Sequence, residues 1–291
     1  MNCYFFLYFL SFPTLAPAQK ITYNKCSKGG ILMNRYLAAI VQLDTAPGWA
    51  DNMERIAAYI ARAAEQGAAL VAFPESFSQY LGSRTPAEDP GNSPTLMQMG
   101  QLARQHGVWL LCGSLFTPDG DRKRNSSFLL SPEGQVVGRY DKMHMFDVTL
   151  PTGETRMESR NFCPGEDIVT VDTPLGVLGM SVCYDIRFPE QYREMTRRGM
   201  EVALVPSMFT KPTGRLCWEV LLRARAIENG CYVIAPNQID GKFGSYGHSM
   251  IVDPQGNVLC QLGEEEGMAL AEIDLELVAA TRAAMPSTTF F

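Results

Sequence analysis

The sequence predicts a single α/β domain in which helices cover a mixed sheet. Short apolar runs typical of buried strands alternate with segments whose apolar residues recur at helical spacing. Three pairs of strand-like runs are joined by turns that contain proline and glycine, as in hairpins. The composition agrees, because 46% of the 291 residues are hydrophobic and 19% are charged, which excludes an intrinsically disordered chain.

The first half of the domain is predicted to alternate strands and helices. Residues 35–43 are typical of a buried strand, and Asp51 is expected to cap a helix whose apolar face extends to Ala64. Gly67 is expected to end this helix, because glycine readily adopts the left-handed backbone found at helix ends. The elements predicted next are a strand over 68–73, a helix over 96–105, a strand over 108–116, and a hairpin of 127–130 with 136–140.

The second half is predicted to contain two further hairpins. One joins 168–171 to 178–183 and the other joins 249–253 to 257–261. The elements predicted around them are a helix over 190–198, a strand over 202–205, a helix over 214–229, and strands over 231–235 and 268–273. No linker-like segment or internal repeat interrupts this pattern, so we expect one domain.

The first 32 residues differ from the rest of the chain. Residues 1–19 carry no charged side chain and include a strongly apolar run, but no basic residues precede that run as they do in a signal peptide. Met33 lies directly before the first predicted strand. We therefore expect that residues 1–32 are an N-terminal extension that is either untranslated or weakly signal-like, and that the domain spans residues 34–286.

The charge of the chain excludes several classes of partner. The net charge is −6 and the isoelectric point is about 5.2, so the chain lacks the positive charge that nucleic acid binding requires. No run of Lys and Arg is long enough to bind a membrane surface. We expect a soluble, mildly acidic globular protein.

The eight cysteines do not form a metal or disulfide pattern. The closest two, Cys217 and Cys231, are 14 residues apart (231 − 217), so no C-x-x-C pair exists. Only three histidines are present. We expect free thiols and no bound metal, and such thiols are typical of a reducing compartment, so a cytoplasmic location is expected.

Three polar residues stand at the carboxyl ends of predicted strands, where α/β proteins bind ligands. Glu75 follows one buried strand, Lys142 follows a hairpin, and Cys183 lies between a strand and a helix. The positive end of that helix is expected to favour the Cys183 thiolate. Each residue has an ordinary alternative: a solvated loop carboxylate, a surface lysine and a small core side chain.

Together the three segments resemble the nitrilase superfamily, the carbon–nitrogen hydrolases. Glu75 lies in F-P-E-S, Lys142 in Y-D-K-M-H-M-F-D-V and Cys183 in V-C-Y-D-I-R-F-P-E, and the resemblance extends from Tyr36 to Pro286. It implies a four-layer α-β-β-α sandwich that assembles into a homodimer or a higher homo-oligomer. It also implies catalysis without a metal or an organic cofactor.

The resemblance implies a role for each residue. Cys183 is the nucleophile that forms a thioester, and Glu75 is the general base and acid. Lys142 and the backbone N–H of Tyr184 stabilise the oxyanion. Glu158 occupies the place of a second glutamate that orients Lys142, with a solvated carboxylate at the rim of the site as the alternative.

The residues that bind substrate are less closely determined by the pattern. Arg187 is a candidate for binding a substrate carboxylate, and an ion pair with Asp185 or Glu190 is the alternative. Phe209 and Thr213 are expected either to wall the pocket or to pack in the core. His144 and His248 are expected to hold loops.

Within the superfamily, the sequence is most similar to Nit-type amidases, and among these to deaminated glutathione amidases. The resemblance therefore implies an amidase for a small carboxylate-bearing amide. The alternatives are an omega-amidase acting on α-ketoglutaramate, a nitrilase, and a catalytically silent binding protein on the same fold. The chain departs from the Nit pattern at Cys217, where relatives usually have a histidine, in the loop 239–244 and at its C-terminus.

Overall fold

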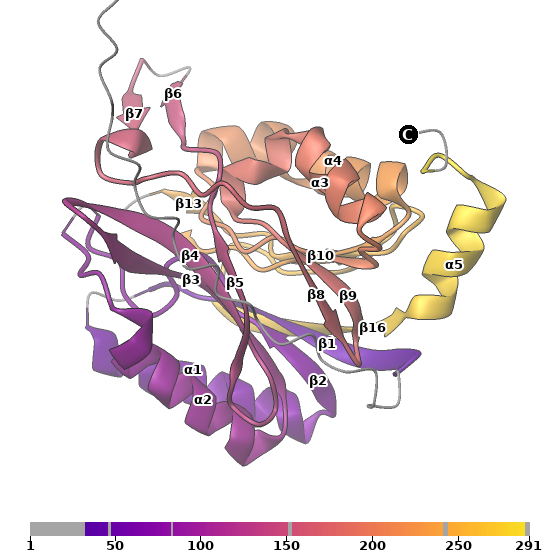
Figure 1. Ribbon diagram of the computed structural model, residues 1–291, viewed down its shortest axis with the longest axis horizontal. Coiled ribbons are helices and arrows are strands. Elements are labelled where there is room, and N and C mark those ends of the chain that lie inside the picture. Colours follow the sequence, from indigo (N-terminus) through magenta and orange to yellow (C-terminus); the bar gives the residue numbers. More distant parts are fainter. Residues whose placement is uncertain (1–32, 46–47, 83, 151–152, 241–243, 289–291) are drawn as a thin grey trace, which may run out of the picture.

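The computed structural model describes residues 33–288 apart from residues 46–47, 83, 151–152 and 241–243 (Figure 1). Two six-stranded sheets pack against each other, and helices cover the outer side of each, so the layers run helix, sheet, sheet, helix. The four-layer sandwich implied by the resemblance is confirmed. The mixed pairing of strands predicted from the alternation of elements is present in both sheets, and their division into two sheets could not be predicted from periodicity, which does not show which strands pair. The predicted extension over residues 1–32 lies outside the described residues.

The first sheet has the strand order β16-β1-β2-β3-β4-β5. Its three strands β1, β2 and β3 run parallel, and the other pairs are antiparallel. The last strand of the chain, β16, lies beside the first, which closes the domain. The strands of this sheet are β1 (Arg35–Gln42), β2 (Ala68–Ala72), β3 (Trp109–Asp119), β4 (Arg122–Leu130), β5 (Val136–Asp141) and β16 (Gly267–Asp274).

The second sheet repeats this plan with the order β15-β14-β11-β10-β9-β8. Its central strands β9, β10 and β11 are parallel, and antiparallel hairpins flank them on both sides. The three predicted hairpins are all present, one as β4–β5 and two in this sheet. The strands are β8 (Val169–Thr173), β9 (Gly176–Met180), β10 (Val202–Leu204), β11 (Tyr232–Ala235), β14 (Met250–Val252) and β15 (Val258–Gln261).

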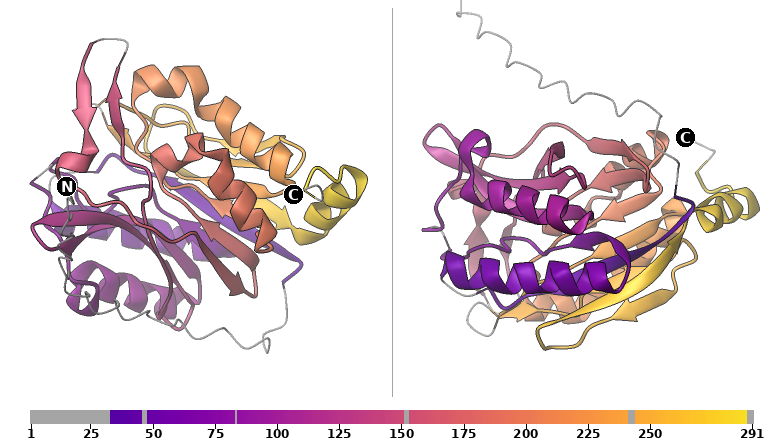
Figure 2. Two further views of the ribbon diagram at one scale, coloured as in Figure 1. Left: turned by 45° about the horizontal axis from the view of Figure 1, so that its top comes forward. Right: turned by 90° about the horizontal axis from the view of Figure 1, so that it is seen from below.

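Two helices cover each sheet, and a further helix lies beside the sandwich (Figure 2). The helix predicted to be capped by Asp51 begins two residues earlier, after Gly48, and Asp51 lies in its first turn, where its charge suits the helix dipole. Ser93 caps the second helix by accepting a hydrogen bond from Leu96 N–H at 3.0 Å. The helices are α1 (Trp49–Glu65), α2 (Pro94–His106), α3 (Pro189–Arg197), α4 (Lys211–Asn229) and α5 (Leu275–Ala284).

Several elements were absent from the sequence prediction. α5 follows β16 directly, and a small hairpin of β6 and β7 projects from the sandwich (Figure 1). Their short or weakly periodic segments carry little pattern. These elements are β6 (Asp147–Thr149), β7 (Thr155–Met157), β12 (Ile239–Asp240), β13 (Ser245–Tyr246) and the short 3-10 helices η1 (Pro90–Asn92), η2 (Glu158–Arg160) and η3 (Cys183–Arg187).

Alternation along the strands divides the core between the layers. In β1, Ala38 and Ile40 face the second sheet, whereas Ala39 and Val41 pack beneath α1 and α2. This burial on both faces explains why the strand is a continuous apolar run. None of the helices within the described ranges is both long and apolar enough to span a membrane.

Candidate active site

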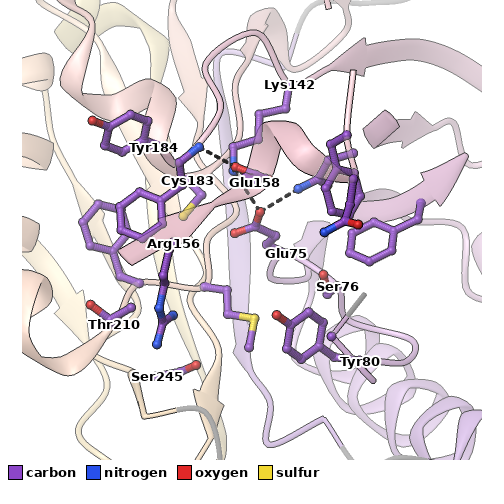
Figure 3. Close-up of a pocket in the computed structure, with 18 of the residues that line it drawn as sticks. Glu75, Ser76, Tyr80, Lys142, Arg156, Glu158, Cys183, Tyr184, Thr210 and Ser245 are labelled. Carbon is purple, nitrogen blue, oxygen red and sulfur yellow. Dashed lines mark hydrogen bonds and ion pairs between the residues drawn. The ribbon is translucent and has the colours of Figure 1, made fainter. Parts of the chain in front are cut away.

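A pocket of about 320 Å³ lies where the carboxyl ends of β2 and β9 meet. It contains every residue to which the resemblance gives a catalytic role (Figure 3). Its aromatic and polar walls come from both sheets, from the β6–β7 hairpin and from the start of α4. The main lining residues are Glu75, Ser76, Tyr80, Phe116, Asn125, Lys142, Phe146, Arg156, Met157, Glu158, Asn161, Phe162, Cys183, Tyr184, Met208, Phe209, Thr210, Thr213 and Ser245.

Glu75 is held from two sides just beyond β2. Asn125 Nδ2, from β4, donates to Glu75 Oε1 at 2.7 Å. The backbone behind it is fixed as well, because Gln238 Nε2 donates to the Glu75 carbonyl at 3.0 Å and Ser76 N–H donates to Ser114 Oγ at 3.0 Å. The carboxylate is therefore buried but precisely oriented towards the pocket.

Lys142 lies between two carboxylates directly after β5. Its Nζ donates to both oxygens of Glu158, at 2.9 and 2.8 Å, and lies 3.4 Å from Glu75 Oε1. Burial lowers the pKa of Lys142, but the charges of Glu158 and Glu75 more than offset this and hold the pKa well above its ordinary value. The side chain is therefore an ammonium ion. Phe146 N–H donates to Glu158 Oε2 at 2.6 Å and fixes that carboxylate in turn.

Cys183 stands on a tight turn between β9 and η3. Its φ is +51°, a left-handed conformation, and its backbone N–H donates to the Pro206 carbonyl at 2.9 Å. Strain at such a residue is typical of functional sites. Burial raises the pKa of the thiol well above its ordinary value, and the negative charge of Glu75 raises it further against the opposing effect of Lys142.

The expected stabilisation of the thiolate by a helix dipole is therefore corrected. The helix that begins at Cys183 is a 3-10 helix of five residues, and α3 begins only at Pro189. Desolvation and the Glu75 carboxylate raise the pKa of the Cys183 thiol more than Lys142 and the backbone N–H of Met208 lower it. The nucleophile of the free protein is a neutral thiol.

Tyr184 and the walls of the pocket lie as the sequence suggested. The backbone N–H of Tyr184 is in the first turn of η3. N–H groups in the first turn of a helix have no carbonyl acceptor within that helix, so this group is suited to donate to an oxyanion. Its ring contacts the ring of Phe146 edge-on, with centroids 5.0 Å apart. Phe209 and Thr213 both line the pocket, and Thr213 Oγ1 shares a hydrogen bond of 2.8 Å with Thr210 Oγ1.

Arg187 does not face the pocket, which corrects its expected role in binding substrate. Its side chain is exposed and its Nη2 donates to Cys217 Sγ at 3.0 Å. The alternative ion pair is not formed either, since within the described residues no salt bridge joins Arg187 to Asp185 or Glu190. The short helix η3 turns the side chain outwards over the ring of Tyr184.

Arg156 is the cation that the sequence analysis missed. It lies in β7, two residues before Glu158, and lines the pocket beside Met157. The available signal was this spacing from the glutamate that orients Lys142. Asn125 and Tyr80 were missed too, because nothing in the sequence near them indicates that they meet Glu75 in space.

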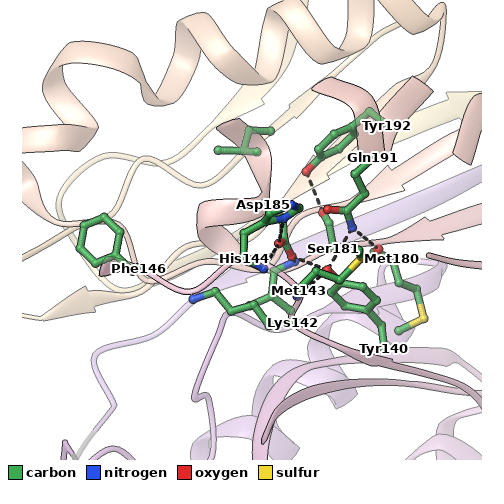
Figure 4. Close-up of polar contacts among 12 residues, drawn as sticks. Tyr140, Lys142, Met143, His144, Phe146, Met180, Ser181, Asp185, Gln191 and Tyr192 are labelled. Carbon is green, nitrogen blue, oxygen red and sulfur yellow. Dashed lines mark hydrogen bonds and ion pairs between the residues drawn. The ribbon is translucent and has the colours of Figure 1, made fainter. Parts of the chain in front are cut away.

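A buried polar network connects the segments that carry Lys142 and Cys183 (Figure 4). Asp185 lies fully buried at its centre. Its Oδ2 accepts from Tyr140 Oη at 2.6 Å and from Val182 N–H at 2.8 Å. Its Oδ1 lies 2.7 Å from His144 Nδ1 and accepts from His144 N–H at 3.1 Å. One carboxylate thus holds the residues two positions before and two positions after Lys142 and the residue directly before Cys183.

The two histidines hold loops, as expected. His144 stacks on Phe188 with ring centroids 3.5 Å apart. His248 has a φ of +57°, and its Nδ1 lies 2.9 Å from the carbonyl oxygen of Tyr246. The departure at Cys217 is a local substitution on α4, where the thiol donates to the Thr213 carbonyl at 2.9 Å. The departures at 241–243 and 289–291 lie outside the described residues.

Comparison with known proteins agrees with this geometry. The family model described as "Carbon-nitrogen hydrolase" matches residues 37–283. A "Deaminated glutathione amidase" of Synechocystis sp. is 39% identical over 266 residues, which cover 88% of this chain and 97% of the relative. The human "Omega-amidase NIT2" is 32% identical over 259 residues, covering 87% of this chain and 94% of the relative.

Solved structures show the same likeness. The crystal structure of the C. elegans NitFhit protein superposes with a TM-score of 0.81 at 36% identity, covering 88% of this chain and 65% of the length of that chain. The family model matches most of the chain, and the four layers and the pocket agree with it. The chain therefore belongs to the carbon–nitrogen hydrolase family.

Proposed function

We propose that this protein is an amidase that hydrolyses a small carboxylate-bearing amide through a thioester on Cys183. The observation that carries the proposal is the convergence of Glu75, Lys142 and Cys183 on one pocket from three separate segments of the chain. A nucleophile, a proton acceptor and a fixed cation are the groups that acyl transfer from an amide requires.

Acylation begins with a neutral thiol. The sulfur of Cys183 attacks the carbonyl carbon and forms the C–S bond, while the thiol proton passes to Glu75. The negative charge that develops on the carbonyl oxygen is stabilised by the Lys142 ammonium ion and by the N–H of Tyr184. As the tetrahedral intermediate collapses, the C–N bond breaks and Glu75 returns the proton to the leaving amine.

Deacylation reverses these roles. Glu75 takes a proton from water as the water oxygen attacks the thioester carbon. Lys142 and the N–H of Tyr184 again stabilise the oxyanion. The C–S bond then breaks, the sulfur regains the proton from Glu75, and the carboxylic acid product leaves. Glu158 holds Lys142 in place through both steps.

Deaminated glutathione is the substrate that we propose first. Support comes from the similarity to relatives of that name, which extends over most of both chains. α-Ketoglutaramate is the second candidate, supported by the similarity to the human omega-amidase. A reducing, cytoplasmic location is proposed as well, since Cys112, Cys163, Cys183, Cys217, Cys231 and Cys260 are all free thiols.

Release of the amine product from each substrate tests the proposal. We would compare the wild-type protein with Cys183→Ala, and use Cys260→Ala as the matched control, since Cys260 lies on β15 outside the pocket lining. We expect turnover that Cys183→Ala abolishes and Cys260→Ala retains, and the larger kcat/KM assigns the substrate. A wild-type protein that hydrolyses neither amide but binds one of them would instead indicate a silent binding protein. Hydrolysis of only the matching nitrile would indicate a nitrilase.

A further inference from the structure

We propose that Arg156 binds a carboxylate of the substrate and so selects an anionic amide over a neutral one of the same length. The inference rests on the proposed amidase function and names the residue that recognises the charge of the substrate. It replaces the role that the sequence suggested for Arg187.

The position of Arg156 satisfies the first requirement, which is access to the bound substrate. The β6–β7 hairpin places its side chain in the lining of the same pocket that holds Cys183. Figure 3 shows the side chain extending towards Thr210 and Ser245 and away from Lys142. A substrate whose amide carbon lies against Cys183 therefore has this cation beside its distal part.

The charge balance of the pocket gives Arg156 a function. Glu75 and Glu158 are two carboxylates facing one ammonium ion, Lys142, and the thiol is neutral, so the catalytic groups carry a formal charge of −1 (two negative, one positive). Such a site repels an anionic substrate. Among the described lining residues, Arg156 is the other basic side chain, and it offsets this negative charge within the lining, to which its partner Glu154 does not belong.

The contacts of Arg156 leave it able to bind a carboxylate. Its Nε donates to Glu154 Oε1 at 2.8 Å, and the two side chains are 37% and 54% exposed. An exposed pair of this kind contributes little stability and exchanges readily. The guanidinium group has further N–H donors on its two terminal nitrogens, and these match the two oxygens of a carboxylate.

The field of Arg156 also reaches the opposite part of the pocket lining. Burial raises the pKa of the Tyr80 hydroxyl, and the charge of Glu75 raises it further, whereas the charge of Arg156 lowers it. Tyr80 lines the same pocket. The guanidinium charge is therefore felt inside the pocket and not only at the surface of the hairpin.

Arg156→Gln tests this role with a pair of probes that differ in charge and by one methyl group. The probes are the monoamide of glutaric acid, an anion, and its methyl ester, which is neutral. We expect Arg156→Gln to lower kcat/KM for the anion by about 100-fold, as the loss of a charged bidentate contact does, and to leave the ester unchanged. Arg156→Lys should restore part of the loss. Arg160→Gln is the matched control, because it removes an exposed charge from the adjacent helix η2 outside the pocket lining.

A binding measurement distinguishes failure of the role of Arg156 from failure of the amidase proposal. Calorimetry of the anion with Cys183→Ala and with the Cys183→Ala, Arg156→Gln double variant needs no turnover. If the wild-type protein hydrolyses neither probe, the amidase function is overturned, yet weaker binding by the double variant still supports Arg156. Three results would overturn the role of Arg156. The first is an equal loss of kcat/KM for the anion and the ester in Arg156→Gln, and the second is an unchanged preference of that variant for the anion. The third is that the anion does not bind to Cys183→Ala.

Discussion

At the scale of single residues, the site is defined by charges that determine one another's protonation. Lys142 remains an ammonium ion because two carboxylates face it in a buried place. The same burial, together with the charge of Glu75, keeps Cys183 protonated. Cys183 is therefore not a thiolate in the free protein, and it loses its proton to Glu75 only as the sulfur attacks the substrate carbonyl. This distinguishes Cys183 from cysteines that a helix N-terminus activates in advance.

A change at Glu75 is expected to lower the pKa of Cys183 and yet to abolish turnover. Glu75→Gln removes a negative charge beside the sulfur, so the thiolate becomes less unfavourable and the pKa of Cys183 should fall. Turnover should nevertheless be lost, because the general base is gone. The ultraviolet absorbance of the thiolate, titrated against pH and corrected with Cys183→Ala, measures the shift. Glu166→Gln, which changes an exposed carboxylate, is the control and should leave the midpoint of the Cys183 titration unchanged. A midpoint that rises or stays constant in Glu75→Gln would contradict this account.

At the scale of elements, the catalytic groups depend on how separate segments are joined. Lys142 follows a strand of the first sheet and Cys183 follows a strand of the second. Asp185 is where the two meet, since it accepts hydrogen bonds from Tyr140, His144 and Val182. Together with the 2.7 Å contact from His144 Nδ1, these bonds restrain the two segments far more than any one of them alone.

We therefore expect Asp185→Asn to act on catalysis as well as on stability. The amide N–H₂ of Asn would face donors, so about half of the contacts would be lost, and stability should fall by about 2–4 kcal/mol. The value of kcat should fall at least about tenfold with little change in KM, because the substrate still binds while Lys142 and Cys183 are misaligned.

Tyr192→Phe provides the matched comparison. It removes the 2.8 Å hydrogen bond between Tyr192 Oη and Ser181 Oγ, two residues before Cys183, but unlike Asp185 this pair does not join the Cys183 segment to the Lys142 segment. Thermal unfolding and steady-state kinetics on both variants distinguish the two effects. Loss of stability in both variants with kcat retained in both would show that Asp185 has no positioning role.

At the scale of the whole molecule, the outer face of α4 exposes a row of apolar side chains. Leu216 and Val220 are 74% and 66% exposed, and Ile227 lies on the same face of the helix. Glu219 and Arg223 lie beside this row and carry opposite charges. Such a face is self-complementary across a two-fold axis, so we propose that a second copy of the chain covers it.

This homodimer is tested by a charge placed in the row. Leu216→Glu should convert the dimer to a monomer, because two carboxylates would be buried against each other. Light scattering after size-exclusion chromatography measures the mass. Met97→Glu is the matched control, since Met97 is 59% exposed on α2 at the other outer layer. A wild-type monomer, or a dimer that survives Leu216→Glu, would argue against this face as the interface.

Much of the molecule could be predicted from the sequence because its signals are local. Apolar periodicity located the main strands and the helices α1 to α4, and the turns with proline and glycine located the three hairpins. Glu75, Lys142 and Cys183 stood out because each follows a strand. α5 and the β6–β7 hairpin were missed, since short segments carry too little pattern to separate them from loops.

The tertiary structure alone decided which side chains meet and in what electrostatic state. Arg187 is four residues from Cys183 in the sequence, but a short helix turns it outwards to Cys217. Arg156 is 27 residues away (183 − 156), but a hairpin brings it into the pocket of Cys183. The division of the strands between two sheets and the neutral state of the thiol have the same origin, because strand pairing and burial depend on contacts between segments that are far apart in the sequence.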